Sequence, residues 1–346
     1  MTRPAGVDFD DAAAINAADS RGVLVEVASA AARVRASAAQ AAEVLPIGWA
    51  EEGRPRAIVV IADGADTMAG GVLAALSGGS CPVVPLTGPL PPWVGATDLV
   101  VAVSADGEHA AVLDPFVAAA RRGPRLLAVG PPECGLSRRA AQARSPYIAV
   151  AAPRDLWSLT VPLLAAADLL RLLAEPLEVE AAAMRLEHVA TACHPSRDSL
   201  VNPGSGLALA LSAGLPQLLG CSALAAVAAR AGALACAARA KSPALHGAPG
   251  REQLTLWDGP YAASRDIFAD PEMGGSDAGP LRLAPVLLRD PTDETPETAE
   301  TLLAAAEARG LVVRELVAQG VGRLERLASL VGVLDYAAAY LGLRQR

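Results

Sequence analysis

The sequence predicts an α/β fold in which parallel sheets are covered by helices on both faces. Short β-branched and apolar runs end in polar loops and are followed by helix-forming segments, which is the pattern of strand, crossover helix and next parallel strand. The second half of the chain repeats this alternation. A length of 346 residues is enough for two domains of about 150 residues, each with its own core.

The first half contains the clearest strand signals. An Ala-rich helix is expected over residues 11–45. Residues 57–62 follow it, and their β-branched run suits a strand buried on both faces. After the loop Asp63 to Thr67 we expect a helix over residues 68–76. The other strands of this half are expected at residues 82–86, 98–103 and 126–130, with a helix ending at Arg122.

The second half is richer in helix. Strands are expected at residues 215–220, 281–288 and 311–317. Helices are expected at residues 156–173, 178–191, 203–211, 222–240, 298–309 and 323–343. The Gly/Pro-rich residues 242–280 are expected to form a functional loop region. We place the domain boundary near Pro153, which gives an N-terminal domain of residues 1–153 and a C-terminal domain of residues 154–346.

Composition excludes several classes of function. The 29 basic and 37 acidic residues leave a net charge of −8, whereas nucleic-acid binding and binding to an anionic membrane need a basic face. The N-terminal residues lack the pattern of a signal peptide, and no apolar stretch offers the roughly 20 uninterrupted residues of a membrane span. We therefore expect a cytoplasmic protein.

No metal or cofactor signature is present. The five cysteines are odd in number, far apart and form no CxxC, which fits a reducing compartment better than a disulfide framework or a zinc site. No two histidines have metal-ligand spacing, and GxxxxGK, GxSxG and GxGxxG are all missing. The expectation is that the protein uses no metal and no cofactor.

Two loops stand where a parallel sheet binds ligands, beyond the carboxyl ends of its strands. They run from Asp63 to Thr67 and from Ser104 to His109. One interpretation is a ligand site that spans both loops, and the other is two well-capped turns. Their carboxylates count against a phosphate ligand, because an Asp at a helix N-terminus occupies the N–H groups itself.

These residues also carry a family resemblance. Residues 59–76 (VVIADGADTMAGGVLAAL) resemble the first loop of the sugar isomerase (SIS) proteins, in the bacterial and archaeal bifunctional phosphoglucose/phosphomannose isomerases. Further segments resemble that family in the same order, at residues 91–104, 152–154, 202–208, 220–228, 287–290 and 320–341. The diverged motifs are similar to those of TobH-like actinobacterial proteins. The resemblance implies two SIS domains of three-layer, flavodoxin-like type, a sugar-phosphate ligand in hexose or mannose-phosphate metabolism, and a homodimer.

The resemblance also implies a set of ligand-binding residues. The family holds the substrate phosphate with hydroxyl groups, but Asp66 replaces its first serine and His109 replaces its threonine. A carboxylate about 4 Å from a phosphate charge costs about 1–4 kcal/mol, so phosphate binding should be weaker here. The ligand-binding residues carried over are Gly64, Asp66, Thr67, Ser104, Asp106, Gly107, His109 and Ser222.

Catalysis by aldose–ketose isomerisation needs a carboxylate, a cation and an acid/base for ring opening. The resemblance assigns the cation to Arg154, and Glu252 and His246 are the nearest candidates for the other two roles. The family's terminal catalytic lysine has no counterpart in the sequence. We therefore expect weakened or lost isomerase activity. An active phosphoglucose/phosphomannose isomerase using Glu252 and Arg154, and a non-catalytic regulatory or scaffold subunit of a sugar-phosphate enzyme, remain the alternatives.

Overall fold

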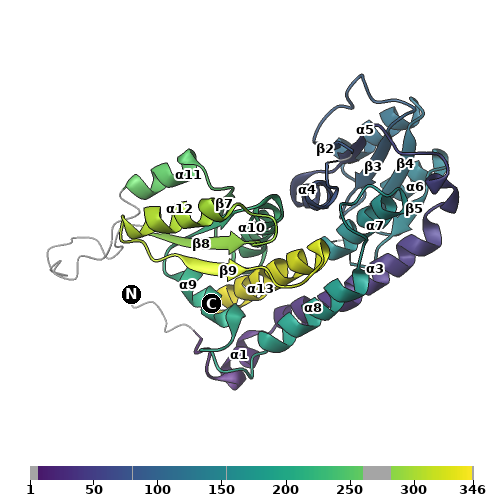
Figure 1. Ribbon diagram of the computed structural model, residues 1–346. Coiled ribbons are helices and arrows are strands. Elements are labelled where there is room, and N and C mark those ends of the chain that lie inside the picture. Colours follow the sequence, from purple (N-terminus) through teal and green to yellow (C-terminus); the bar gives the residue numbers. More distant parts are fainter. Residues whose placement is uncertain (1–6, 80, 153, 260–281, 345–346) are drawn as a thin grey trace. The chain divides into compact units, whose positions relative to one another are not determined.

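The computed structural model describes residues 7–79, 81–152, 154–259 and 282–344. The chain divides into two compact units, which we name by their sheets (Figure 1). The five-strand unit comprises residues 29–184 and 322–324, and the four-strand unit comprises residues 1–28, 185–321 and 325–346, where described. The domain boundary at residue 153 stays a prediction, and the compact units have other bounds.

A parallel sheet with the order β2-β1-β3-β4-β5 forms the centre of the five-strand unit. Its strands are β1 (Ile58–Ile61), β2 (Val83–Leu86), β3 (Leu99–Val103), β4 (Arg125–Gly130) and β5 (Tyr147–Ala149). Every residue of β1 and β3 is buried, as the predicted two-sided burial requires. The four strands predicted from the sequence are confirmed, whereas the short β5 was not predicted.

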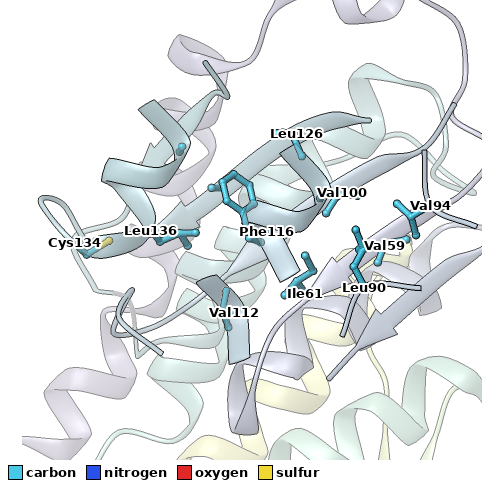
Figure 2. Packing of buried hydrophobic residues seen from close by; sticks show 14 residues of the cluster. Val59, Ile61, Leu90, Val94, Val100, Val112, Phe116, Leu126, Cys134 and Leu136 are labelled. Carbon is cyan, nitrogen blue, oxygen red and sulfur yellow. The ribbon is translucent and has the colours of Figure 1, made fainter. Parts of the chain in front are cut away.

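Helices cover both faces of this sheet. They are α3 (Ala30–Val44), η1 (Ile47–Ala50), η2 (Gly64–Asp66), α4 (Thr67–Leu76), α5 (Ala110–Ala120), α6 (Gly135–Gln142) and α7 (Leu156–Leu169). On one face, Val59 and Val100 share a core with Phe116 of α5 and Leu136 of α6 (Figure 2). On the other face, a Cβ at Gly70 of α4 would lie 3.2 Å from Val60. The unit therefore has the expected three layers.

The four-strand unit repeats this winding. Its sheet has the order β7-β6-β8-β9, all parallel, from β6 (Leu215–Gly220), β7 (Leu245–Gly247), β8 (Leu283–Arg289) and β9 (Arg314–Val317). In chain order, β6, β7, β8 and β9 correspond to β1, β2, β3 and β4. The predicted strands at 215–220, 281–288 and 311–317 are confirmed within a few residues, with residue 281 outside the described residues.

The remaining helices complete the chain. They are α1 (Ala12–Ala18), α2 (Val23–Ala28), α8 (Val179–Ala192), α9 (Pro203–Ser212), α10 (Ala223–Ala235), η3 (Cys236–Ala240), α11 (Arg251–Thr255), η4 (Leu256–Asp258), α12 (Pro296–Glu307) and α13 (Arg323–Arg344). Leu218 of β6 contacts the α10 and α13 face of the sheet, because a Cβ at Gly232 would lie within 3.0 Å of both Leu218 and Leu334. Leu219 instead packs with Trp257 and with α12. This sheet is therefore also covered on both faces.

Two sequence predictions were wrong. Residues 11–45 form three helices rather than one, because the Asp19 carboxylate accepts the N–H groups of Val23 and Leu24 at 2.7 and 2.9 Å and starts α2 after Gly22, whose φ is +65°. The described part of residues 242–280 is not a loop region, since it forms β7, α11 and η4. Trp257 anchors this part by donating from Nε1 to Oε1 of Gln217 at 2.7 Å. Residues 260–280 of that stretch lie outside the described residues.

Two helical stretches of the described chain are long and apolar enough to cross a membrane, Ala223–Ala240 and Arg323–Arg344. Their apolar windows are 56% and 94% buried, respectively. The core helices of a globular domain pass the same test of length and composition. Burial shows that α13 serves as the core helix of its sheet, so the apolar character of these stretches is weak evidence for a membrane protein.

Candidate functional site

The strand order of the five-strand unit places its topological switch point between β1 and β3. From β1 the chain crosses over to β2 on one side, and β3 lies on the other side of β1. Ligands of open parallel sheets bind at such a point, beyond the carboxyl ends of the two strands. The β1 loop (residues 62–67) and the β3 loop (residues 104–109) meet there, as the sequence predicts.

A carboxylate connects the two loops. The backbone N–H of Ala105 donates to Oδ2 of Asp66 at 2.7 Å. Burial raises the pKa of Asp66, and the nearby carboxylates of Asp106 and Asp63 raise it further, whereas the Ala105 N–H and the charge of Arg154 oppose the shift. Asp66 immediately precedes α4, but its side chain does not cap that helix. It therefore acts between the loops.

The other residues of the β1 loop form a tight turn. Gly64 has a φ of +54°, a conformation that favours glycine. The Thr67 hydroxyl donates to the carbonyl oxygen of Gly64 at 2.6 Å. The hydroxyl proton of Thr67 is thus used inside the loop rather than presented to a ligand.

The β3 loop is held by its own polar side chains. The Ser104 hydroxyl donates to Oδ1 of Asp106 at 3.0 Å and accepts the N–H of Gly107 at 3.0 Å. The N–H of Glu108 donates to the same Asp106 oxygen at 2.9 Å and is the main cause that lowers the pKa of Asp106. Carboxylate and hydroxyl oxygens of the chain thus accept the N–H groups of residues 105, 107 and 108.

The β3 loop is also fixed against α6. Gly107 has a φ of +68°, and a Cβ there would lie 2.3 Å from Sγ of Cys134. Its carbonyl oxygen accepts the N–H of Leu136 at 2.8 Å, and Oε1 of Glu108 accepts the N–H of Gly135 at 2.7 Å. Glu108 therefore occupies the N-terminus of α6. The sequence reading did not assign this role to Glu108, although a carboxylate in a loop beside a helix N-terminus is a usable signal.

His109 and Arg154 lie near the same two loops. Nδ1 of His109 is 3.3 Å from Oδ2 of Asp63, and both side chains are about half exposed. The pairing of Asp63 with His109 was not predicted from the sequence, because the two residues lie in different loops and their spacing follows no known motif. Arg154 is exposed and acts on Asp66 through its charge.

The predicted site residues are divided between the two units, each of which is described by itself. Those in the five-strand unit are Gly64, Asp66, Thr67, Ser104, Asp106, Gly107, His109 and Arg154. Those in the four-strand unit are Ser222, His246 and Glu252. Both His246 and Glu252 are exposed, but the protein removes part of the water around the His246 ring, and this partial desolvation together with the charge of Arg230 lowers the pKa of His246.

Ser222 has a local structural role. Its hydroxyl accepts the N–H of Ala225 at 3.1 Å and caps α10. The β8 loop of the same unit begins at Asp290, which is completely buried and paired with Arg326 of α13 at 3.1 Å. Arg289 is held between Glu294 at 2.7 Å and Glu315 at 2.9 Å. The charged groups at this edge of the four-strand sheet are thus paired within the chain.

Among the described residues, no three His, Cys, Asp or Glu side chains are grouped so as to hold a metal ion. The carboxylates of the two loops instead accept backbone N–H groups or pair with His109. Chemically, the arrangement offers hydrogen-bond acceptors and a nearby guanidinium.

Comparison with known proteins gives the fold a name. Residues 200–346 match the family model described as the bacterial phospho-glucose isomerase C-terminal SIS domain. The parallel sheets flanked by helices and the solved structures below are consistent with that match. The chain has the SIS fold. No curated protein matches the sequence.

Solved SIS-fold structures cover most of the chain. A hypothetical protein of Thermus thermophilus has a TM-score of 0.63 at 14% identity, over 96% of this chain and 88% of that one. The C-terminal domain of glucosamine-fructose-6-phosphate aminotransferase from Francisella tularensis has a TM-score of 0.56 at 12% identity, over 90% and 93%. Tagatose-6-phosphate ketose/aldose isomerase from Escherichia coli has a TM-score of 0.57 at 11% identity, over 86% of each chain. At such identities the likeness concerns the fold alone.

Proposed function

We propose that this SIS-fold protein binds a sugar phosphate or a related small carbohydrate, and that its aldose–ketose isomerase activity is weakened or lost. The matching family model and the sugar-phosphate enzymes among the similar structures support the ligand class. The phosphoglucose/phosphomannose isomerase branch, its TobH-like members included, belongs to the proposal through the sequence resemblance. So does a place in cytoplasmic hexose or mannose-phosphate metabolism.

One observation carries the proposal of weakened activity. Where the resemblance implies hydroxyl groups that hold a phosphate, the Asp66 carboxylate lies 2.7 Å from the Ala105 nitrogen and Asp106 accepts the N–H of Glu108. Two carboxylates repel a phosphate dianion, and neither donates a hydrogen bond to it when ionised. Substrate binding through a phosphate group should suffer accordingly.

The proposed binding residues are those that the sequence resemblance implies. They are Gly64, Asp66, Thr67, Ser104, Asp106, Gly107, His109 and Ser222. If isomerase activity exists, we propose Arg154 as the cation, Glu252 as the proton-transferring carboxylate and His246 as the ring-opening acid/base.

The test is a coupled assay of the purified chain with fructose 6-phosphate, following glucose 6-phosphate and mannose 6-phosphate separately. We expect turnover far below the rate of about 10 per second that is typical of enzymes. Turnover at that ordinary rate would contradict the loss of activity. In that event Glu252→Gln should abolish it while ligand binding persists.

A thermal-shift screen of hexoses, hexosamines and their phosphates tests the ligand class, because a ligand of the native state raises the melting temperature. A shift with at least one sugar is expected, and no shift with any of them would contradict sugar binding. The pairing of two copies is also part of the proposal. Sedimentation that shows only monomer at micromolar concentration would contradict the homodimer.

A further inference from the structure

We propose that Asp66 is a specificity-determining residue, which excludes anionic groups from the β1–β3 edge of the five-strand sheet. The inference rests on the proposed function in one respect, that this edge contributes to the binding of a small carbohydrate. It goes further because it assigns the preference between a charged and an uncharged ligand to one side chain.

The first step concerns the hydrogen-bond donor that Asp66 occupies. The Ala105 N–H lies in the β3 loop, at the switch point where open parallel sheets bind ligands. A carboxylate oxygen 2.7 Å from that nitrogen shows that this N–H accommodates an anionic oxygen. The oxygen belongs to the chain itself, so a ligand anion has to displace it.

The second step concerns charge. With Asp66 ionised, a ligand anion at this edge meets the Asp66 carboxylate, which the charges of Asp63 and Asp106 already repel. Arg154 is the cation that stabilises the charged form of Asp66. Removing the Asp66 carboxylate would therefore uncover the Ala105 N–H and would leave the Arg154 charge available to a ligand.

The third step concerns the helix that Asp66 precedes. α4 has ten residues, and the Asp66 side chain does not cap it. By contrast, the Ser222 hydroxyl caps α10 at the corresponding place in the four-strand unit. The positive end of the α4 dipole would then add to the attraction for an anion once the carboxylate is gone.

The experiment compares inorganic phosphate binding, by calorimetry at low ionic strength, among the wild-type chain, Asp66→Ser and Asp63→Ser. Asp63→Ser is the matched control, because it removes the same charge from the same loop but leaves the contact between Asp66 and Ala105. We expect Asp66→Ser to bind phosphate at least tenfold more tightly than the wild type, which corresponds to about 1.4 kcal/mol. The increase in phosphate affinity of Asp63→Ser should be clearly smaller than that of Asp66→Ser.

Asp66→Asn is the second variant and keeps the proposal testable if Asp66→Ser does not fold. It removes the charge but retains an oxygen that accepts the Ala105 N–H, so its gain should lie between that of the wild type and that of Asp66→Ser. An unchanged phosphate affinity in both Asp66 variants, or an equal gain in Asp63→Ser, would overturn the role of Asp66.

Glucose and glucose 6-phosphate separate this outcome from a failure of the proposed function. If Asp66→Ser binds phosphate more tightly but no variant binds glucose or glucose 6-phosphate, the role of Asp66 is supported and the proposed sugar binding is contradicted. The role of Asp66 fails, and sugar-phosphate binding stands, if the wild type binds glucose 6-phosphate tightly and Asp66→Ser does not improve it.

Discussion

The two units wind their first four strands in the same order but use the corresponding loops differently. In the five-strand unit the residue before the first crossover helix, Asp66, extends to the β3 loop and bonds the Ala105 N–H. In the four-strand unit the corresponding residue, Ser222, bonds the first turn of its own helix. The Asp66 side chain therefore connects two loops, whereas the Ser222 side chain caps one helix.

The loops after the third strand differ in burial. Glu108 of the β3 loop pairs with Arg138 of α6 at 3.3 Å, and both side chains are more than half exposed. Asp290 of the β8 loop pairs with Arg326 of α13, and the two side chains are only 0% and 4% exposed. The ion pair of the β8 loop is therefore buried in its unit, whereas the ion pair of the β3 loop is exposed to solvent.

The largest expected effect is on the buried pair. Arg326→Met leaves the Asp290 carboxylate buried without its guanidinium, which should cost about 3–5 kcal/mol of unfolding free energy in urea titrations. Arg138→Met, which breaks the corresponding exposed pair, should cost less than about 1 kcal/mol. Equal losses of unfolding free energy in the two variants would contradict the expected difference between the buried and the exposed ion pair.

A double variant checks the cause. Asp290→Leu combined with Arg326→Met removes both charges, and it should recover part of the stability lost in Arg326→Met alone. No recovery would mean that the loss arises from the packing of Arg326 or from its hydrogen bond to the Val321 carbonyl rather than from an unpaired carboxylate.

A smaller effect is expected within the five-strand unit, between the two glycines of its loops. Gly64 and Gly107 both have positive φ, but a Cβ at Gly64 meets nothing within 4 Å, whereas one at Gly107 would overlap Cys134. Gly64→Ala should cost about 1 kcal/mol from the backbone alone. Gly107→Ala should exceed it by about 1–3 kcal/mol, since the β3 loop must shift from α6.

Denaturation of the two alanine variants under the same conditions gives this difference. If they are equally stable, the β3 loop is not fixed against α6, and the difference in packing between Gly107 and Gly64 does not affect stability. The comparison also predicts that Gly107→Ala, but not Gly64→Ala, alters the amide exchange of Gly135 and Leu136, whose N–H groups bond the loop.

The sequence predicts the sheets well because their strands are continuous apolar runs, as residues 58–61 and 99–103 illustrate. The sequence also predicts that the β1 and β3 loops lie at the same edge, because the carboxyl ends of parallel strands share one edge of the sheet. Prediction from the sequence fails where the local structure depends on a single hydrogen bond between residues that are far apart in the sequence. No spacing rule states that Asp66 bonds Ala105 rather than its own helix, or that Trp257 finds Gln217 and orders a Gly/Pro-rich segment.

The smallest expected effect is the pH dependence of the two loop carboxylates, which should have opposite signs. Burial raises the folded-state pKa of Asp66 above its ordinary value of 3.8, so its contribution to stability is fully present below that value and is lost as the pH rises through the folded-state pKa. The Glu108 N–H lowers the pKa of Asp106, so its contribution is present above 3.8 and is lost as the pH falls through the folded-state pKa.

Asparagine variants isolate the two contributions. Asp66→Asn should be more stable than the wild type at neutral pH, because Asn carries no charge to bury and still accepts the Ala105 N–H, and this advantage should shrink as the solution is acidified. Asp106→Asn should be less stable than the wild type at neutral pH, and its deficit should shrink on acidification. Urea denaturation of the three proteins from neutral to acid pH measures both differences. If both variants were more stable than the wild type at neutral pH, or both less stable, the burial of Asp66 would not distinguish its effect on stability from that of Asp106. The carboxylate between the two loops would then contribute to stability like the carboxylate within the β3 loop.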